Sequence, residues 1–191
     1  MNHSDWRAAW QPMINAVGTE FDAEPARFVA DRIEASALRR YLEPLEFDCP
    51  LHYDSDVARE LGYTEVVVPC SALVTFAYPP MWRPGEQLFT DSERNAQPSG
   101  LAISGFITGL EPETVGFFAT NFEADYLHPA LVGDRLARVG ALLVACEPKE
   151  TSVGRGAFLT WQSNIVNDRH QLIARFKNTF YRYVPHDLVV S

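Results

Sequence analysis

Two short segments of the 191-residue chain carry the residue types best suited to chemistry. The first ends at His52, whose imidazole can exchange a proton near neutral pH, with Glu46 and Asp48 shortly before it. A carboxylate and an imidazole that met in one site could serve as a general acid and base. Alternatively, His52 bonds a backbone carbonyl and both acids are solvated loop residues. The sequence leaves both interpretations open.

The second segment is Cys70–Ser71, which opens an almost entirely apolar run from Ala72 to Tyr78 and so predicts the start of a buried helix. Backbone N–H groups at a helix start carry partial positive charge and can hold an anion. Because no G-x-S-x-G motif surrounds Ser71, we expect its hydroxyl to cap the helix rather than to act as a nucleophile. The thiols of Cys70 and Cys49 are expected to be inert packing groups.

Aromatic side chains follow this helix and could line a ligand pocket, although core packing or a subunit interface explains them equally well. They are Tyr78, Met81, Trp82 and Phe89. Four arginines could hold phosphate groups, although scattered arginines are usually solvated charges. These are Arg83, Arg94, Arg135 and Arg138.

Composition narrows the class of protein. A net charge of -9 and a pI near 5.0 disfavour nucleic acid or an anionic membrane as the main partner. The three cysteines match neither a zinc site nor a disulfide framework, which predicts free thiols in a reducing compartment. With neither a signal peptide nor a membrane span in the sequence, we expect a soluble cytoplasmic protein without metal or cofactor.

The patterns predict one α+β domain over residues 1–191, in which a helical first part precedes a strand-rich second part. Helices are expected within residues 5–15 (an N-terminal extension over 1–16), from Ser36, and from a cap at Asp54 to Gly62. A strand is expected over Arg27–Asp31, and residues 83–100 are expected to form a surface loop insertion. Further strands are predicted at Leu101–Gly109, Val115–Tyr126, Leu136–Cys146, Ala157–Val166 and Leu172–Val184, with a turn at Asn167–Asp168. An antiparallel sheet wrapped around the buried helix at 72–78 describes a hot-dog fold.

Several motifs occur in an order that resembles the MaoC-like hydratases and dehydratases, and the resemblance covers nearly the whole chain. The motifs are Val17–Phe21, Cys49-Pro50-Leu51-His52, Asp54 with Ala58, Gly62-Tyr63, Val68-Pro69, Tyr126 with Pro129, and Val132-Gly133-Asp134. The resemblance implies reversible hydration of an enoyl thioester, the chemistry of a lyase. It also implies that His52 is one member of the acid–base pair, and that amides near Cys70 and Ser71 hold the thioester oxygen.

The chain departs from the family pattern at the catalytic acid. The family places an aspartate five residues before the histidine, where this chain has Phe47, and a phenyl ring cannot transfer a proton. A one-residue shift of the loop could bring either Asp48 or Glu46 to His52 instead. Tyr78 and Trp82 are then candidate substrate-binding residues, together with Cys70 and Ser71.

Two classes of function follow. In the first, the chain is an enoyl-thioester hydratase or 3-hydroxyacyl-thioester dehydratase, or the partner subunit of a heteromeric one. In the second, it is an inactive hot-dog protein that binds an acyl thioester or another small ligand, or an enzyme recruited to different chemistry. The expected partners are an acyl-CoA or acyl carrier protein thioester and a second MaoC-like subunit, in a homodimer or a heterodimer.

Overall fold

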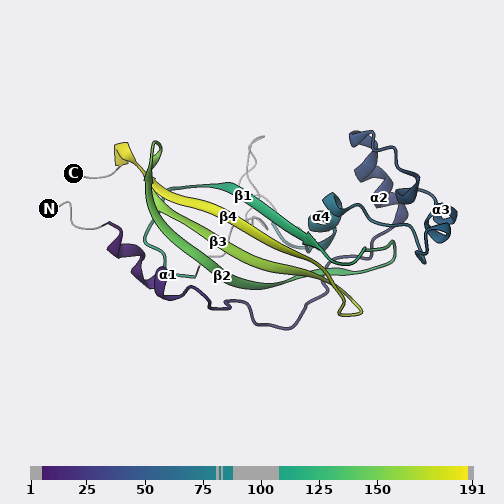
Figure 1. The fold of residues 1–191 in the computed structure, drawn as a ribbon, viewed down its shortest axis with the longest axis horizontal. Coiled ribbons are helices and arrows are strands. Elements are labelled where there is room, and N and C mark those ends of the chain that lie inside the picture. Colours follow the sequence, from purple (N-terminus) through teal and green to yellow (C-terminus); the bar gives the residue numbers. More distant parts are fainter. Residues whose placement is uncertain (1–5, 81, 83, 88–107, 189–191) are drawn as a thin grey trace.

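The computed structural model describes residues 6–80, 82, 84–87 and 108–188, and a long curved antiparallel sheet dominates it (Figure 1). The sheet has four strands in the order β1-β4-β3-β2. They are β1 (Gly116–Tyr126), β2 (Leu136–Thr151), β3 (Gly154–Asn167) and β4 (Leu172–Pro185). Each matches a strand predicted from the alternation of apolar residues. The strand predicted at Leu101–Gly109 and the loop predicted at 83–100 lie largely outside the described residues.

The predicted turn between β3 and β4 is confirmed, and Asn167 organises it. The buried Asn167 side chain accepts hydrogen bonds from the amides of Arg169 and Gln171 at 3.1 and 2.9 Å. The His170 amide donates to the Asn167 carbonyl, and His170 takes a left-handed conformation with φ 60°. The hairpin register of β3 and β4 follows from this turn.

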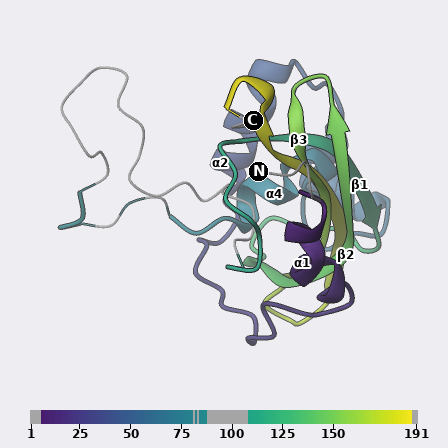
Figure 2. The same cartoon turned by 90° about the vertical axis from the view of Figure 1, so that its left-hand side faces the viewer.

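Short helices cover the inner face of the sheet, and Figure 2 shows α1, α2 and α4 on the same side of it. The α-helices are α1 (Gln11–Asn15), α2 (Ala35–Leu42), α3 (Ser55–Glu60) and α4 (Leu73–Ala77). The 3-10 turns are η1 (Ala8–Trp10), η2 (Glu43–Leu45), η3 (Pro50–His52), η4 (Cys70–Ala72) and η5 (His186–Leu188). The α+β class is therefore confirmed. Among the described helices, none has the length and apolar character needed to cross a bilayer.

Two hydrophobic clusters hold the helices to the sheet. In the first, α2 and α4 pack on Ile165, Ile173 and Phe176. In the second, Trp10 and Met13 cover Trp161 and its neighbours on β2 and β3. The central helix is thus short, and α1 covers the part of the inner face that α4 does not reach.

Local signals set the ends of α3 as predicted. The Asp54 carboxylate accepts hydrogen bonds from the amides of Asp56 and Val57 at 2.8 and 3.4 Å, and Gly62 ends the turn with φ 89°. The strand predicted at Arg27–Asp31 is wrong. That segment is not part of the sheet, and isolated hydrogen bonds hold it in place. The Arg135 side chain, for example, donates to the Ala30 carbonyl at 3.2 Å.

The two edges of the sheet differ. Residues 18–21 run along β2: the Gly18 amide donates to the Leu143 carbonyl at 2.8 Å, and the Phe21 amide to the Ala141 carbonyl at 3.0 Å. The Glu20 carboxylate accepts from the Ala141 amide, at a bulge where Gly140 has φ 80°. In the described part of the chain, nothing pairs with the outer edge of β1. That strand exposes Phe117, Phe118, Phe122 and Tyr126.

Candidate functional site

His52 is held by a hydrogen bond that defines its proton chemistry. It ends η3, and its Nδ1 lies 2.6 Å from the carbonyl oxygen of Val67. A carbonyl oxygen can only accept, so Nδ1 carries the hydrogen and, in the neutral ring, Nε2 carries the lone pair. The backbone bond expected of a structural histidine is therefore present, and it also leaves a nitrogen that can act as a base.

Phe47 occupies the neighbourhood of this base. Its ring centroid lies 5.4 Å from that of His52, with the rings tilted at 41°. Phe47 is 44% exposed and lines the same cavity as His52. This cavity has a volume of about 550 Å³. The residue at the family's acid position is therefore beside the histidine, and it has no proton to give.

The remaining walls of the cavity come from distant parts of the chain. They include Cys70 and Ser71 of η4, Leu73 of α4, and Tyr126, Leu127 and His128 at the end of β1. Among its described lining residues there is no carboxylate. Asp48 is exposed and not among them, and neither is Glu46, which adopts a left-handed conformation with φ 49°. Within the described residues, no cluster of three or more His, Cys, Asp or Glu is arranged to hold a metal ion.

The start of η4 offers amides without a side-chain cap. Pro69 is the N-cap residue, and no side chain caps η4 or α4, so the predicted capping role of Ser71 is wrong. Ser71 and Cys70 are instead exposed to the cavity. These amides can therefore donate hydrogen bonds to an oxygen that bears negative charge.

Two protonated groups lie near these amides. Partial burial raises the pKa of the Cys70 thiol, which favours its neutral form, although the residue is exposed to the cavity and not packed in the core as predicted. Burial, together with the Cys70 sulfur, raises the pKa of Tyr126, so its hydroxyl stays a donor. The sequence identifies Tyr126 only as part of a motif with Pro129. Its alternation with Ala124 on one face of β1 was the available signal.

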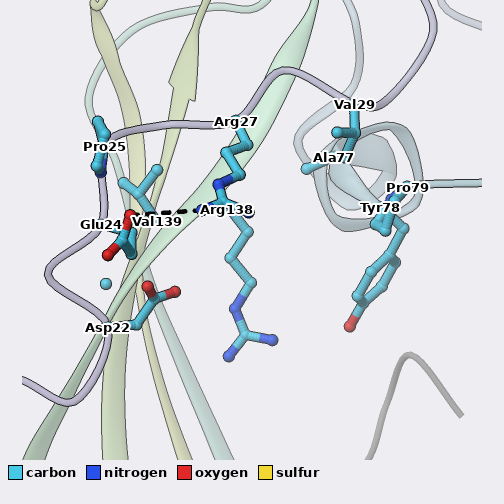
Figure 3. A pocket seen from close by; sticks show the side chains of 11 residues that line it. Asp22, Glu24, Pro25, Arg27, Val29, Ala77, Tyr78, Pro79, Arg138 and Val139 are labelled. Atoms are coloured by element: carbon cyan, nitrogen blue, oxygen red, sulfur yellow. Dashed lines mark hydrogen bonds and ion pairs between the residues drawn. The ribbon is translucent and has the colours of Figure 1, made fainter.

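The other predicted substrate-binding residues lie elsewhere. Tyr78 follows α4 and lines a second cavity of about 450 Å³ with Arg138 (Figure 3). Trp82 is 47% exposed, and its indole N–H donates to the Glu86 carbonyl at 2.8 Å. Arg135 is tied to the carbonyl of Ala30. The other candidates, Met81, Arg83, Phe89 and Arg94, lie outside the described residues.

Comparison with known families agrees with this architecture. Residues 15–176 match the family described as the FAS1-like dehydratase domain region, and the chain belongs to that family. Its fold is the hot-dog fold that solved MaoC-like dehydratases and an (R)-hydratase also have. No curated protein matches the chain.

Solved structures with the same fold include complexes of two different subunits. The ChsH1–ChsH2 complex from Mycobacterium tuberculosis is 18% identical with a TM-score of 0.64, covering 95% of this chain and 97% of that chain. The HadBC (3R)-hydroxyacyl-ACP dehydratase complex from the same organism is 13% identical with a TM-score of 0.55, covering 87% and 96%. The MaoC-like dehydratase from Rhodospirillum rubrum is 22% identical with a TM-score of 0.54, covering 88% and 93%. At these identities the likeness shows the fold.

Proposed function

We propose that this chain is the partner subunit of a heteromeric enoyl-thioester hydratase or 3-hydroxyacyl-thioester dehydratase. One observation carries the proposal: the His52 cavity has a base and oxygen-binding amides, whereas Phe47 lies where the acid would be. The chain then forms part of a thioester pocket but cannot catalyse the reaction by itself.

The chemistry shows what this pocket lacks. In hydration, water adds to the β-carbon, and a base such as Nε2 of His52 takes the proton that water loses. The electron pair of the double bond moves toward the thioester oxygen, which amides such as those of Cys70 and Ser71 can stabilise. A proton must also reach the α-carbon. His52 could return one, but in this family a carboxylate shares the task, and the described cavity has none.

A second subunit that differs from this chain supplies what is missing. Two copies of this chain would both carry Phe47, so a homodimer would repeat the deficiency. The open edge of β1, with its exposed phenylalanines beside the cavity wall at Tyr126, provides a surface for another hot-dog sheet. HadBC and ChsH1–ChsH2, which share the fold, are also complexes of two named components.

A second candidate rests on the orientation of His52. Because Nδ1 donates to Val67, Nε2 can serve as the base of a self-sufficient hydratase in which the loop before η3 brings Asp48 into the cavity. This candidate requires the exposed Asp48 to move toward the histidine.

Restoring the acid tests the proposal directly. We expect the wild-type chain alone to leave crotonyl-CoA unhydrated, and Phe47→Asp to produce a rate gain of about 100-fold or more over the wild type, the usual effect of a positioned acid or base. Phe47→Asn is the matched control, since it has the same size without a titratable proton. His52→Ala added to Phe47→Asp should remove the gain.

Other outcomes separate the candidates. Activity of the wild-type chain alone, lost in both His52→Ala and Asp48→Asn, would establish the self-sufficient hydratase. If no variant and no mixture with a MaoC-like partner binds crotonyl-CoA, both thioester functions are wrong, and the chain binds another small ligand.

A further inference from the structure

Aromatic rings are frequent in the walls of the His52 cavity, and the hydration chemistry described above uses only one of them. The described lining residues with an aromatic ring, imidazoles included, are Phe47, His52, Tyr63, Tyr126 and His128. They come from the loop before η3, from η3 itself, from the segment after α3, and from the end of β1 and the residues that follow it. A cavity on which rings converge from separate segments is suited to bind another ring.

Phe47 is held beside His52 and is only partly covered. The bond between Nδ1 of His52 and the Val67 carbonyl, at 2.6 Å, fixes the imidazole, and the Phe47 ring packs against it with the centroids 5.4 Å apart. Phe47 is nevertheless half-exposed and lines the cavity. An aromatic side chain already held in one position can pack against a ligand without a large ordering cost.

Tyr126 provides a second ring that is held in place before any ligand binds. Its ring meets that of the buried Phe176 edge to face, with the centroids 6.3 Å apart and the planes at 80°. Tyr126 also remains half-exposed and lines the cavity. Phe47 and Tyr126 therefore offer two preorganised aromatic contacts from distant parts of the chain.

The proposed reaction places the β-carbon of the substrate near His52. The thioester oxygen would lie at the amides of Cys70 and Ser71, and His52 would activate the water that adds to the β-carbon. A group bonded to the β-carbon would then lie on the His52 side of the cavity, beside Phe47. An aromatic ring at this position is conjugated with the double bond, which makes the substrate flat and suits it to packing against another ring.

The charge of the walls narrows the kind of ring. Among the lining residues that the structure describes there is no Asp, Glu, Lys or Arg. A charged substituent on the ring would lose hydration without gaining an ion pair, so the walls favour an uncharged ring. The cavity volume of about 550 Å³ lies within the usual range of small-molecule sites.

We propose that the thioester substrate carries an uncharged aromatic ring on its β-carbon, and that Phe47 determines this specificity by packing against the ring. The inference rests on the proposed thioester function and adds the substrate class: β-aryl enoyl thioesters and the 3-hydroxyacyl thioesters that they form with water. The residue at the family's acid position then has a binding role.

Isothermal titration calorimetry of the full chain with cinnamoyl-CoA and with trans-2-nonenoyl-CoA tests the inference. The two esters have the same enoyl thioester and the same number of acyl carbons, and only cinnamoyl-CoA has a ring. We expect wild type to bind cinnamoyl-CoA roughly fivefold more tightly, the effect of one or two aromatic contacts. Phe47→Leu keeps an apolar side chain without the ring, and should lower this ratio about threefold.

Two further variants check that the ring of Phe47 is responsible. Phe47→Tyr keeps the ring and should keep the ratio. Tyr53→Leu removes another half-exposed ring, directly after η3, which is not among the described residues that line the His52 cavity. It should also leave the ratio unchanged. Equal decreases in Tyr53→Leu and Phe47→Leu would overturn the role of Phe47.

Cinnamamide, which has the aryl enoyl group without coenzyme A, separates this inference from the proposed function. If neither ester binds but ligand-observed NMR shows cinnamamide binding to wild type and more weakly to Phe47→Leu, the thioester function is wrong and the aromatic site stands. If both esters bind equally, or the nonenoyl ester binds more tightly, the inference is wrong and the thioester function stands. Absence of binding of all three compounds to folded wild type would overturn both.

Discussion

The two edge strands of the sheet differ in how far the described chain covers their backbone hydrogen-bonding groups. Along β2, residues 18–21 and Glu20 satisfy the backbone, and Trp10 and Met13 bury the adjoining inner face. Along β1, the described residues provide no neighbour, and the side chains of Phe117 and Phe122 remain 53% and 51% exposed. An unpaired edge with exposed aromatic side chains is unusual in a protein that acts alone. The difference agrees with the proposal made above: the described chain covers the β2 edge itself, and β1 is the edge proposed to receive a partner.

The largest expected effect is on stability, and it concerns the inner face of β2 that the N-terminal helix covers. Trp10 is 2% exposed and packs in the cluster beneath β2. Trp10→Ala should lower the free energy of unfolding by about 3–5 kcal/mol, because it leaves a cavity under the sheet. Denaturant unfolding measures the loss. Trp82→Ala, at a tryptophan that is 47% exposed, should cost less than about 1 kcal/mol. Equal losses would mean that the N-terminal segment is not part of the core.

The next largest effect is on assembly, and it concerns the edge of β1. Phe122→Lys places a charge at a half-exposed position of β1, so it should weaken assembly at least tenfold. Because the Phe122 ring also contacts the buried Phe176, with the centroids 5.2 Å apart, the change should cost about 1–3 kcal/mol of stability. The native mass of the tagged protein purified from its source should fall toward the 21.5 kDa of one chain.

A matched substitution at the other end of the sheet checks the site of assembly. Val153 is 42% exposed and lies in the turn between β2 and β3. Val153→Lys should leave the native mass unchanged. If Phe122→Lys also retains the wild-type mass, β1 is not the interface.

A smaller effect isolates the carboxylate at the β2 bulge. Glu20→Ala removes the acceptor for the Ala141 amide and should cost about 1–2 kcal/mol of stability. Glu43→Ala breaks an exposed pair with Arg39 at 3.8 Å and should cost about 0.5 kcal/mol or less. Thermal unfolding compares the two variants. Similar losses would show that residues 18–21 do not need Glu20 to stay on β2.

The smallest effect is in cysteine reactivity. Cys146 of β2 packs against the Trp10 cluster, and burial raises its pKa from 9.0 to about 11, so it stays a thiol over most of the alkaline range. Iodoacetamide labelling followed by peptide mass spectrometry should show Cys146 reacting only as the pH approaches 11. Cys70, exposed in the cavity beside β1, should react at lower pH although its pKa is also raised.

The sign of the stability change follows from the same shift. Between pH 9 and 11 the unfolded chain loses the Cys146 proton while the folded chain keeps it, so stability falls as pH rises through this window. Labelling of the denatured chain is the control, because all cysteines should then react alike. Cys146 reacting before Cys70 in the folded protein would contradict the comparison.

Strong local patterns explain which parts of the fold could be predicted. Alternation located all four described strands, and the cap at Asp54 and the glycine at Gly62 set the ends of α3. The predicted end of β2 at Cys146 is too early, because pairing with β3 carries the strand to Thr151. The segment Arg27–Asp31 looks like a strand locally but finds no ladder. Pairing depends on distant residues, which local patterns do not reveal.

Local patterns likewise do not reveal which distant residues meet in the two cavities. The motif order predicted that Cys70 and Ser71 belong with His52, and one cavity brings them together. Tyr126 reaches that cavity because β1 ends near Cys70, a tertiary relation that the alternation of β1 alone does not reveal. Tyr78 and Arg138 are sixty residues apart in sequence, and neither pattern nor motif connects them.

The segment at residues 18–21 also limits how many subunits can add to the sheet. A sheet with two open edges can add neighbours without end, which is the geometry of a fibre. Here the middle of β2 is already occupied, so in the described part of the chain only β1 can receive another sheet. If the partner is built in the same way, joining the two leaves a blocked strand at each end. Polymerisation then stops at the pair, and the exposed phenylalanines of β1 promote assembly without promoting aggregation.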